Sequence, residues 1–178
     1  LDNLPRVVAS ATLFGSPAAV PVPDLDHTEH LLVIGANPLV SNGSGMVSPD
    51  IGKRLRAIRE RGGRIVVVDP RRTETALMAD EHHFVRPGAD VFLLLAIAER
   101  LFSSGVAARS PFCREAGFEA LRGAVSGFTA ERVSARVGLP AATIQAIADD
   151  LGRARRSICY GRMGTCVQEH GTACTLLL

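Results

Sequence analysis

The sequence predicts an α/β fold: a Rossmann-like, doubly wound and mainly parallel sheet with helices on both faces. Two continuous apolar runs, residues 31–34 and 65–68, are typical of strands that are buried on both faces. Between them, apolar residues recur at helical spacing from about residue 51 to Arg61, and Gly62 and Gly63 end the segment. This strand, helix and strand have the length of one right-handed βαβ unit.

The other elements follow from the same kinds of pattern. Residues 7–11 are predicted to form a short strand, and the proline-containing residues 15–26 a loop. Ser48 or Asp50 is predicted to cap the helix that follows the first glycine-rich loop. Further along, the predicted elements are a turn of helix at 74–79, a strand at 83–85, helices at 90–102 and over about 109–151, a strand at 157–160 and a final helix up to residue 178. We therefore expect one α/β domain over residues 1–178.

Composition excludes several classes of function. The net charge of +2 argues against a general nucleic-acid binder, which normally carries a strongly basic face. The longest apolar run, residues 91–98, is too short to cross a bilayer, so no membrane segment is expected. The four cysteines form no CxxC pair and match no zinc or iron–sulfur spacing. We expect no metal ligands, and reduced thiols in a cytoplasmic protein.

Polar and glycine-rich residues follow the two buried strands, at the edge where open parallel sheets bind ligands. Gly35 lets the backbone approach a bulky ligand, and Ser41 offers a hydroxyl to a diphosphate. Arg71 offsets phosphate charge, and Asp69 accepts hydrogen bonds from ribose or from a guanine edge. Asp90 is a second acceptor of that kind. The chain has no GxGxxG and no P-loop motif, so the residues alone predict a nucleotide-like ligand bound without either motif.

These residues also have structural interpretations. Asn37 precedes Pro38 and is an ordinary turn former, while Asp90 is placed to cap a helix. His82 and His83 are interpreted as the start of a strand, because no carboxylate or thiol lies at metal-ligand spacing from them. Asp69 is the strongest single candidate, since a carboxylate at the end of a buried strand needs a partner.

Three motifs occur in order along the chain: VIGANP at 33–38, GGRIVVVDPRRTETA at 62–76, and RPGAD at 86–90, with Ala-Asp at 79–80 between the last two. Together they resemble the molybdopterin oxidoreductase family, the superfamily of dimethyl sulfoxide reductase and formate dehydrogenase. The resemblance covers about residues 14–178 and is most specific over 31–95. It implies a Rossmann-like domain without the dinucleotide fingerprint, which binds molybdopterin guanine dinucleotide carrying molybdenum or tungsten.

The resemblance also implies roles for individual residues. It places Gly35 and Asn37 near the diphosphate, Asp69 and Arg71 near the guanosine, and Asp90 near the guanine edge. Where the family usually has Thr before that aspartate, this chain has Ala89. The candidate cofactor-binding residues are Gly35, Asn37, Pro38, Ser41, Asp69, Arg71, Thr73, Gly88 and Asp90.

For the whole protein, the resemblance implies an enzyme in which this domain binds the guanosine diphosphate part of the cofactor. A 4Fe–4S cluster and the ligand of molybdenum are expected upstream, and a domain that completes the cofactor site downstream. The chain alone is therefore expected to hold no catalytic residue and to be inactive. Expected partners are the rest of the parent polypeptide, a small-molecule substrate and electron-transfer subunits. The alternatives are a non-catalytic structural or electron-relay subunit, as in the large iron–sulfur subunit of respiratory complex I, and the middle domain of a thiamine-diphosphate enzyme.

Overall fold

A parallel sheet lies at the centre of the protein. The computed structural model describes residues 3–111 and 113–178, and in this part of the chain four strands pair in the order β3-β2-β1-β4. Every pair is parallel, with His30 opposite both Arg64 and Ser157. The strands are β1 (His30–Ile34), β2 (Arg64–Val68), β3 (Glu81–His83) and β4 (Ser157–Gly161).

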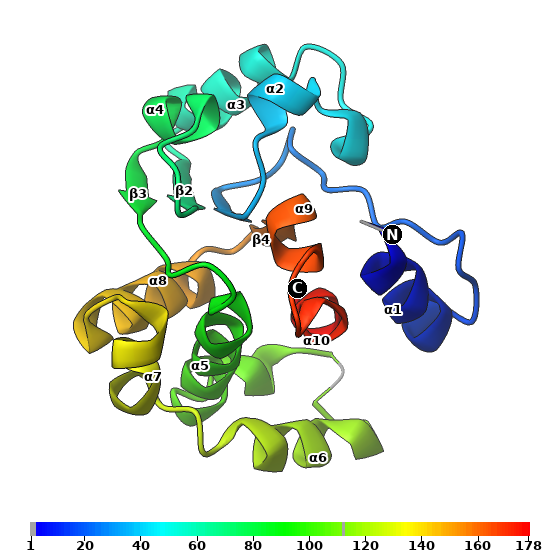
Figure 1. Cartoon of the computed structure of the whole chain (residues 1–178), viewed down its shortest axis with the longest axis vertical. Helices are drawn as coiled ribbons and strands as arrows, with labels where there is room; N and C mark the ends of the chain where they lie inside the picture. Colours follow the sequence, from blue (N-terminus) through cyan, green and yellow to red (C-terminus); the bar gives the residue numbers. More distant parts are fainter. Residues whose placement is uncertain (1–2, 112) are drawn as a thin grey trace.

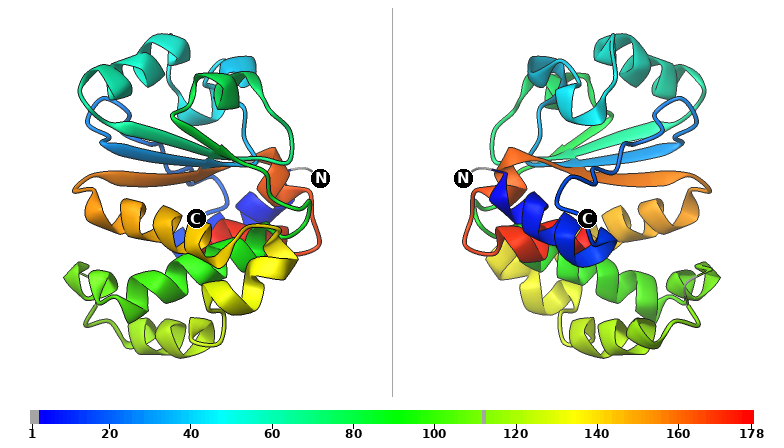
Figure 2. Two further views of the ribbon diagram at one scale, coloured as in Figure 1. Left: turned by 90° about the vertical axis from the view of Figure 1, so that its left-hand side faces the viewer. Right: turned by 90° about the vertical axis from the view of Figure 1, so that its right-hand side faces the viewer.

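Helices cover both faces of this sheet (Figure 1, Figure 2). The α-helices are α1 (Leu4–Phe14), α2 (Pro38–Ser41), α3 (Ile51–Glu60), α4 (Glu74–Met78), α5 (Asp90–Ser103), α6 (Ala116–Val125), α7 (Ala130–Val137), α8 (Ala141–Arg153), α9 (Met163–Cys166) and α10 (Gly171–Leu177). Two short 3₁₀ helices, η1 (Ser44–Met46) and η2 (Val106–Arg109), lie between them. Figure 2 shows α3 above the sheet and α8, α10, α5 and α7 below it, with α6 farthest from the sheet. The predicted fold class is therefore confirmed.

The central strand β1 explains why two separate cores form. All five of its residues are buried, and successive side chains point to opposite faces of the sheet. Leu31 belongs to the core that α3 covers, with Leu55 and Ile58. Leu32 belongs to the core between the sheet and the helices α5, α7 and α8, with Ile144. Each fully buried aliphatic side chain contributes roughly 1.5–3 kcal/mol, so the unbroken apolar run favours a central strand over any exposed position.

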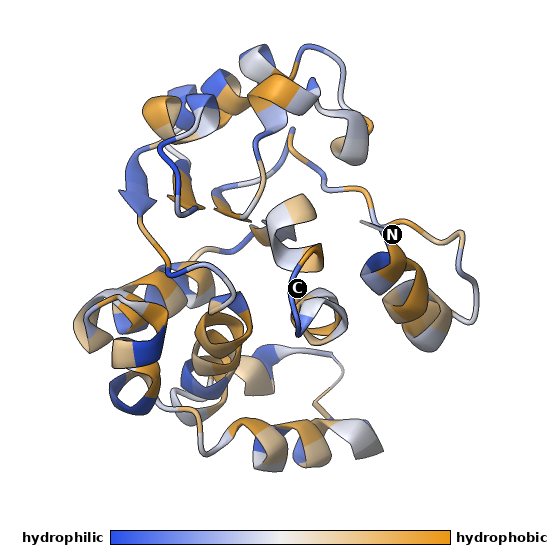
Figure 3. Ribbon diagram, in the orientation of Figure 1, coloured by the Kyte–Doolittle hydropathy of each residue, from blue (hydrophilic) through white to orange (hydrophobic). Residues whose placement is uncertain are grey.

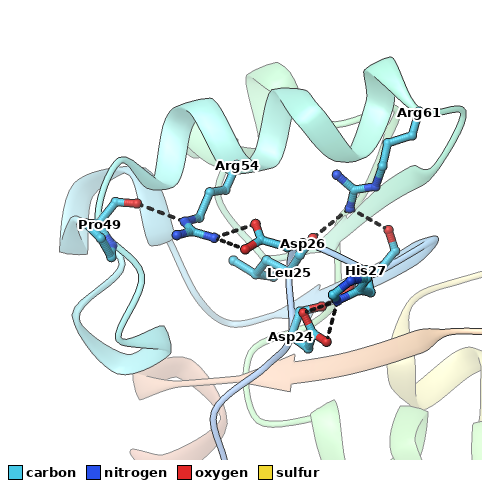
Figure 4. Close-up of polar contacts among 8 residues, drawn as sticks. Asp24, Leu25, Asp26, His27, Pro49, Arg54 and Arg61 are labelled. Atoms are coloured by element: carbon cyan, nitrogen blue, oxygen red, sulfur yellow. Dashed lines mark hydrogen bonds and ion pairs between the residues drawn. The ribbon is translucent and has the colours of Figure 1, made fainter.

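Two arginines of the α3 region hold the segment that leads into β1 (Figure 4). Arg61 donates from Nη2 to the carbonyl oxygens of Leu25 and Thr28, at 2.7 and 2.9 Å. Arg54 forms an ion pair with the carboxylate of Asp26 and donates to the carbonyl of Pro49. Arg61 satisfies two backbone carbonyls of this irregular segment, and Arg54 holds the side chain of Asp26, so the two arginines tie the segment to α3 just before β1.

The N-terminal segment corrects one prediction. Residues 7–11 lie within the helix α1 rather than in a strand. Pro5 stands in its first turn and Gly15 ends it in the left-handed conformation, both of which favour a helix. Figure 3 shows much of α1 coloured as hydrophobic, and a nearly all-apolar stretch has no clear period from which to tell strand from helix.

Smaller differences concern boundaries and caps. The strand β3 begins two residues earlier than predicted, at Glu81. Asp50 does stand at the N-cap position of α3, but its backbone is left-handed with φ of 53° and its side chain forms no cap hydrogen bond, so the predicted capping is wrong. The predicted helical region 109–151 is divided into the separate helices α6, α7 and α8, and the last of these continues to Arg153.

No helix among the described residues has the length and apolarity required to cross a membrane.

Candidate functional site

A cleft of about 560 Å³ lies at the carboxyl ends of the strands. The chain leaves β1 toward β2 and β3 on one side and later returns to the other side of β1 as β4. Connections of opposite direction on either side of one strand create a crevice, and open α/β sheets bind ligands at that point. The lining residues come from the loops after all four strands: Gly35, Ala36, Asn37, Val40, Ser41, Asp69, Pro70, Arg71, Thr73, Pro87, Gly88, Asp90, Arg162, Met163, Gly164, Val167 and Gln168.

Two glycines bring the loops after β1 and β4 into backbone contact. The amide of Gly164 donates to the carbonyl of Gly35 at 2.9 Å. A Cβ added at Gly35 would lie 2.9 Å from the Cα of Gly164, closer than real Cβ atoms approach. The backbone of Gly35 is also left-handed, with φ of 56°. Both facts require glycine at this position.

The loop after β2 is ordered by its own polar side chains. A carboxylate oxygen of Asp69 accepts a hydrogen bond of 2.8 Å from the amide of Arg71. Thr73 caps α4, because its hydroxyl accepts from the amide of Ala76 at 3.0 Å. The exposed guanidinium of Arg71 lies 3.7 Å from the carboxylate of Glu74. These contacts order the loop after β2, and Asp69 lines the cleft.

Asn37 ties the loop after β1 to helix α4. Its amide nitrogen donates to the carboxylate of Glu74 at 2.7 Å, and its amide oxygen accepts from the hydroxyl of Thr75, also at 2.7 Å. The hydrogen bond from Asn37 is the main cause that lowers the pKa of Glu74 below its ordinary value. Asn37 therefore lines the cleft and at the same time holds two of its loops together.

Asp90 is the buried carboxyl of the cleft. It is 4% exposed, and one of its oxygens accepts a hydrogen bond of 2.9 Å from the side-chain amide of Gln168. Burial raises the pKa of Asp90; the negative charge of Asp69 adds to this and the bond from Gln168 opposes it. The amide oxygen of Gln168 is buried and has no hydrogen-bond partner among the described residues. Around Asp90, hydrogen-bond acceptors therefore outnumber donors. Such a site is complementary to a ligand that presents several N–H donors on one edge.

The structure brings most of the predicted residues together. Eight of the nine candidates line this one cleft: Gly35, Asn37, Ser41, Asp69, Arg71, Thr73, Gly88 and Asp90. Pro38 does not line it, because it is the buried first residue of α2. Asp90 is the first residue of α5, and Ala89 stands at its N-cap position, so the interpretation of Asp90 as the cap is wrong. The roles of these residues toward a ligand stay predictions.

The residues after β4 were missed by the sequence patterns. Arg162, Met163, Gly164 and Gln168 line the cleft as fully as the loops after β1 and β2. One signal was available, because the predicted strand at 157–160 is followed by a glycine-flanked polar turn, as β1 is. Applying the rule for strand ends to every predicted strand would have found them.

None of the four cysteines is among the residues that line the cleft. Burial raises the pKa of both Cys159 and Cys174 to about 12, so these thiols stay protonated near neutral pH. Cys159 and Cys166 instead line a second, mainly apolar cavity of about 320 Å³ between α1, β4 and α10. Within residues 3–111 and 113–178, no three histidine, cysteine or acidic side chains come together in a way that would hold a metal ion.

Proteins of similar sequence belong to the family that the three motifs indicate. The chain is 32% identical to the "F420-dependent formate dehydrogenase 2 subunit alpha" of Methanococcus maripaludis, over 90% of this chain and 23% of that protein. It is 30% identical to the "thiosulfate reductase molybdopterin-containing subunit" of Salmonella typhimurium, over 82% of this chain and 18% of that protein. The chain therefore spans less than a quarter of the length of either relative. No protein-family model matches it.

A solved structure shares the fold. The acetylene hydratase of Pelobacter acetylenicus superposes with a TM-score of 0.78 at 23% identity, over 98% of this chain and 23% of that one. The similarity thus extends over the sheet and the helices on both of its faces. With its three ordered motifs, its parallel sheet and these relatives, the chain belongs to the molybdopterin oxidoreductase superfamily.

Proposed function

We propose that this chain is the part of a molybdopterin-dependent oxidoreductase that binds the guanosine diphosphate portion of molybdopterin guanine dinucleotide. The observation that supports this most is the convergence of Gly35, Asp69 and Asp90 from three strand ends on one cleft. A cleft at this topological position, in which Gly35 and Gly164 pack against each other without side chains, suits a nucleotide. The whole protein would be the enzyme, with its substrate and electron-transfer partners outside this chain.

The guanine base fits the acceptor-rich end of the cleft. Guanine presents two N–H donors on one edge, at N1 and N2, which an ionised carboxylate accepts in bidentate fashion. Asp90 supplies the carboxylate, and beside it lies the amide oxygen of Gln168, which has no hydrogen-bond partner among the described residues. Asp69, at the end of β2, supplies a further acceptor for ribose hydroxyls.

When bound, the molybdopterin supplies the metal that exchanges electrons with the substrate. The residues of this chain would bind and orient the nucleotide end of the cofactor. Gly35 and Gly164 keep the base of the cleft free of side chains, and the bonds of Asn37 keep two of its walls in place. These contacts would set where the nucleotide end of the cofactor is held.

Calorimetric titration of the chain with GDP and with ADP tests the proposal. We expect GDP to bind more tightly, because adenine has an acceptor at N1 that would face the carboxylate of Asp90 and leave it unsatisfied. Equal affinities, or tighter binding of ADP, would contradict the guanine assignment. The binding of guanosine alone, measured in parallel, separates recognition of the base from recognition of the diphosphate.

A further inference from the structure

One arginine of the cleft was not among the residues that the sequence singled out. Arg162 follows β4 directly and precedes α9, and it lines the same cleft as Gly35 and Ser41. Arg162 is partly buried. It reaches this position from the strand that lies on the opposite side of β1 from Asp69.

Gly45 provides the surface on which the Arg162 guanidinium rests. A Cβ added at Gly45 would overlap the Nη1 and Cζ atoms of Arg162 and would also come too close to the hydroxyl of Tyr160. Gly45 itself is buried within η1, between β1 and α3. The absence of a side chain at residue 45 is therefore what allows the guanidinium to lie against this turn.

The Arg162 guanidinium has no acceptor within the described part of the chain: no hydrogen bond or ion pair joins its side chain to residues 3–111 or 113–178. Arg71, the other arginine that lines the cleft, is 65% exposed and already lies near Glu74. A partly buried guanidinium without an acceptor is stabilised strongly by an oxyanion, because charge-assisted bonds are about twice as strong as neutral ones. Of the two, Arg162 is thus the better placed to bind an anionic ligand.

We propose that Arg162 binds the diphosphate of the nucleotide and that Gly45 positions its guanidinium for this contact. The inference rests on the proposed function, since it assumes that the cleft holds a guanine nucleotide. The planar guanidinium donates two parallel N–H bonds to phosphate oxygens, a geometry that the ammonium of lysine cannot reproduce. Arg162 would thereby recognise the diphosphate while Asp90 recognises the base.

The test compares the wild type with Arg162→Gln, titrated with GDP, guanosine and inorganic pyrophosphate. Arg162→Gln removes the charge in a side chain that makes no bond within the described residues, so the fold is expected to persist. We expect its affinity for GDP to fall by about tenfold while its affinity for guanosine is unchanged. Arg162→Lys should recover part of the loss. Arg72→Gln, at an exposed residue outside the cleft lining, is the matched control and should bind as the wild type does.

Gly45→Ala provides a second, independent variant. Its methyl group would displace the guanidinium, so it should lower the affinity for GDP but not for guanosine, with folding checked by thermal melting. Unchanged GDP binding by Arg162→Gln, or an equal loss for guanosine, would overturn the inference. So would a wild type that binds GDP no better than guanosine. If GDP is still preferred to ADP in those cases, the proposed function stands and only the role of Arg162 fails.

Discussion

Replacing Asp90 by Ala is expected to abolish a preference for GDP over ADP of roughly tenfold to hundredfold. The carboxylate of Asp90 is nearly fully buried, and its neighbour Gln168 supplies only one donor to it. Guanine satisfies the remaining acceptor capacity, whereas adenine opposes it with a lone pair, and an unsatisfied buried acceptor costs roughly 1–3 kcal/mol. Calorimetric titration of both nucleotides gives the ratio of dissociation constants directly.

Two further variants make this result interpretable. Asp90→Asn keeps the shape of the side chain and one acceptor but loses the bidentate carboxylate, so it should retain only part of the preference. Asp24→Ala removes an exposed carboxylate, outside the cleft lining, that is bonded to His27, and it should bind both nucleotides as the wild type does. A preference for GDP that persists unchanged in Asp90→Ala would show that a group other than the Asp90 carboxylate recognises the base.

Gly35→Ala is expected to lower the free energy of unfolding by about 2–5 kcal/mol. The new methyl group meets two penalties at once. The left-handed backbone at φ of 56° disfavours any L-residue, and the Cβ would lie 2.9 Å from the Cα of Gly164. Because the second contact is with backbone, neither loop relieves it by a change of rotamer. Urea denaturation followed by circular dichroism measures the loss.

Gly62→Ala is the matched control for this prediction. Gly62 is also left-handed, with φ of 83°, but a Cβ there would meet no atom of residues 3–111 or 113–178 within 4 Å. It should therefore show only the backbone penalty, about 1–2 kcal/mol. Equal losses in the two variants would mean that the loops after β1 and β4 separate freely, and that the close approach of Gly35 and Gly164 does not define the cleft.

The central βαβ unit could be predicted because its signals are local and strong. An apolar run such as residues 31–34 is stable only where both faces of a strand are covered, which implies a parallel sheet. The glycine pair 62–63 marks the end of α3 without reference to the rest of the fold. Once these strands are placed, Asp69 and Gly35 must meet at one edge of the sheet, as they do.

Other features depend on contacts that sequence spacing does not reveal. The helix α1 has an apolar sequence that suits either a strand or a helix, and its packing against α10 decides between them. Gln168 reaches Asp90 across 78 positions in the sequence. Arg162 and Gly45 come together only because β4 pairs with β1, although β2, β3 and several helices separate these two strands in the sequence.

Mapping GDP onto the amide NMR spectrum of the isotope-labelled chain shows directly whether the cleft at the strand ends is the nucleotide site. We predict that GDP shifts the amide signals of Gly35, Asp69 and Asp90, which line this cleft. Signals around the apolar cavity, such as those of Ser10 and Cys159, should stay in place. Shifts concentrated at Ser10 and Cys159, with the signals of the cleft residues unchanged, would contradict the placement of the nucleotide in this cleft.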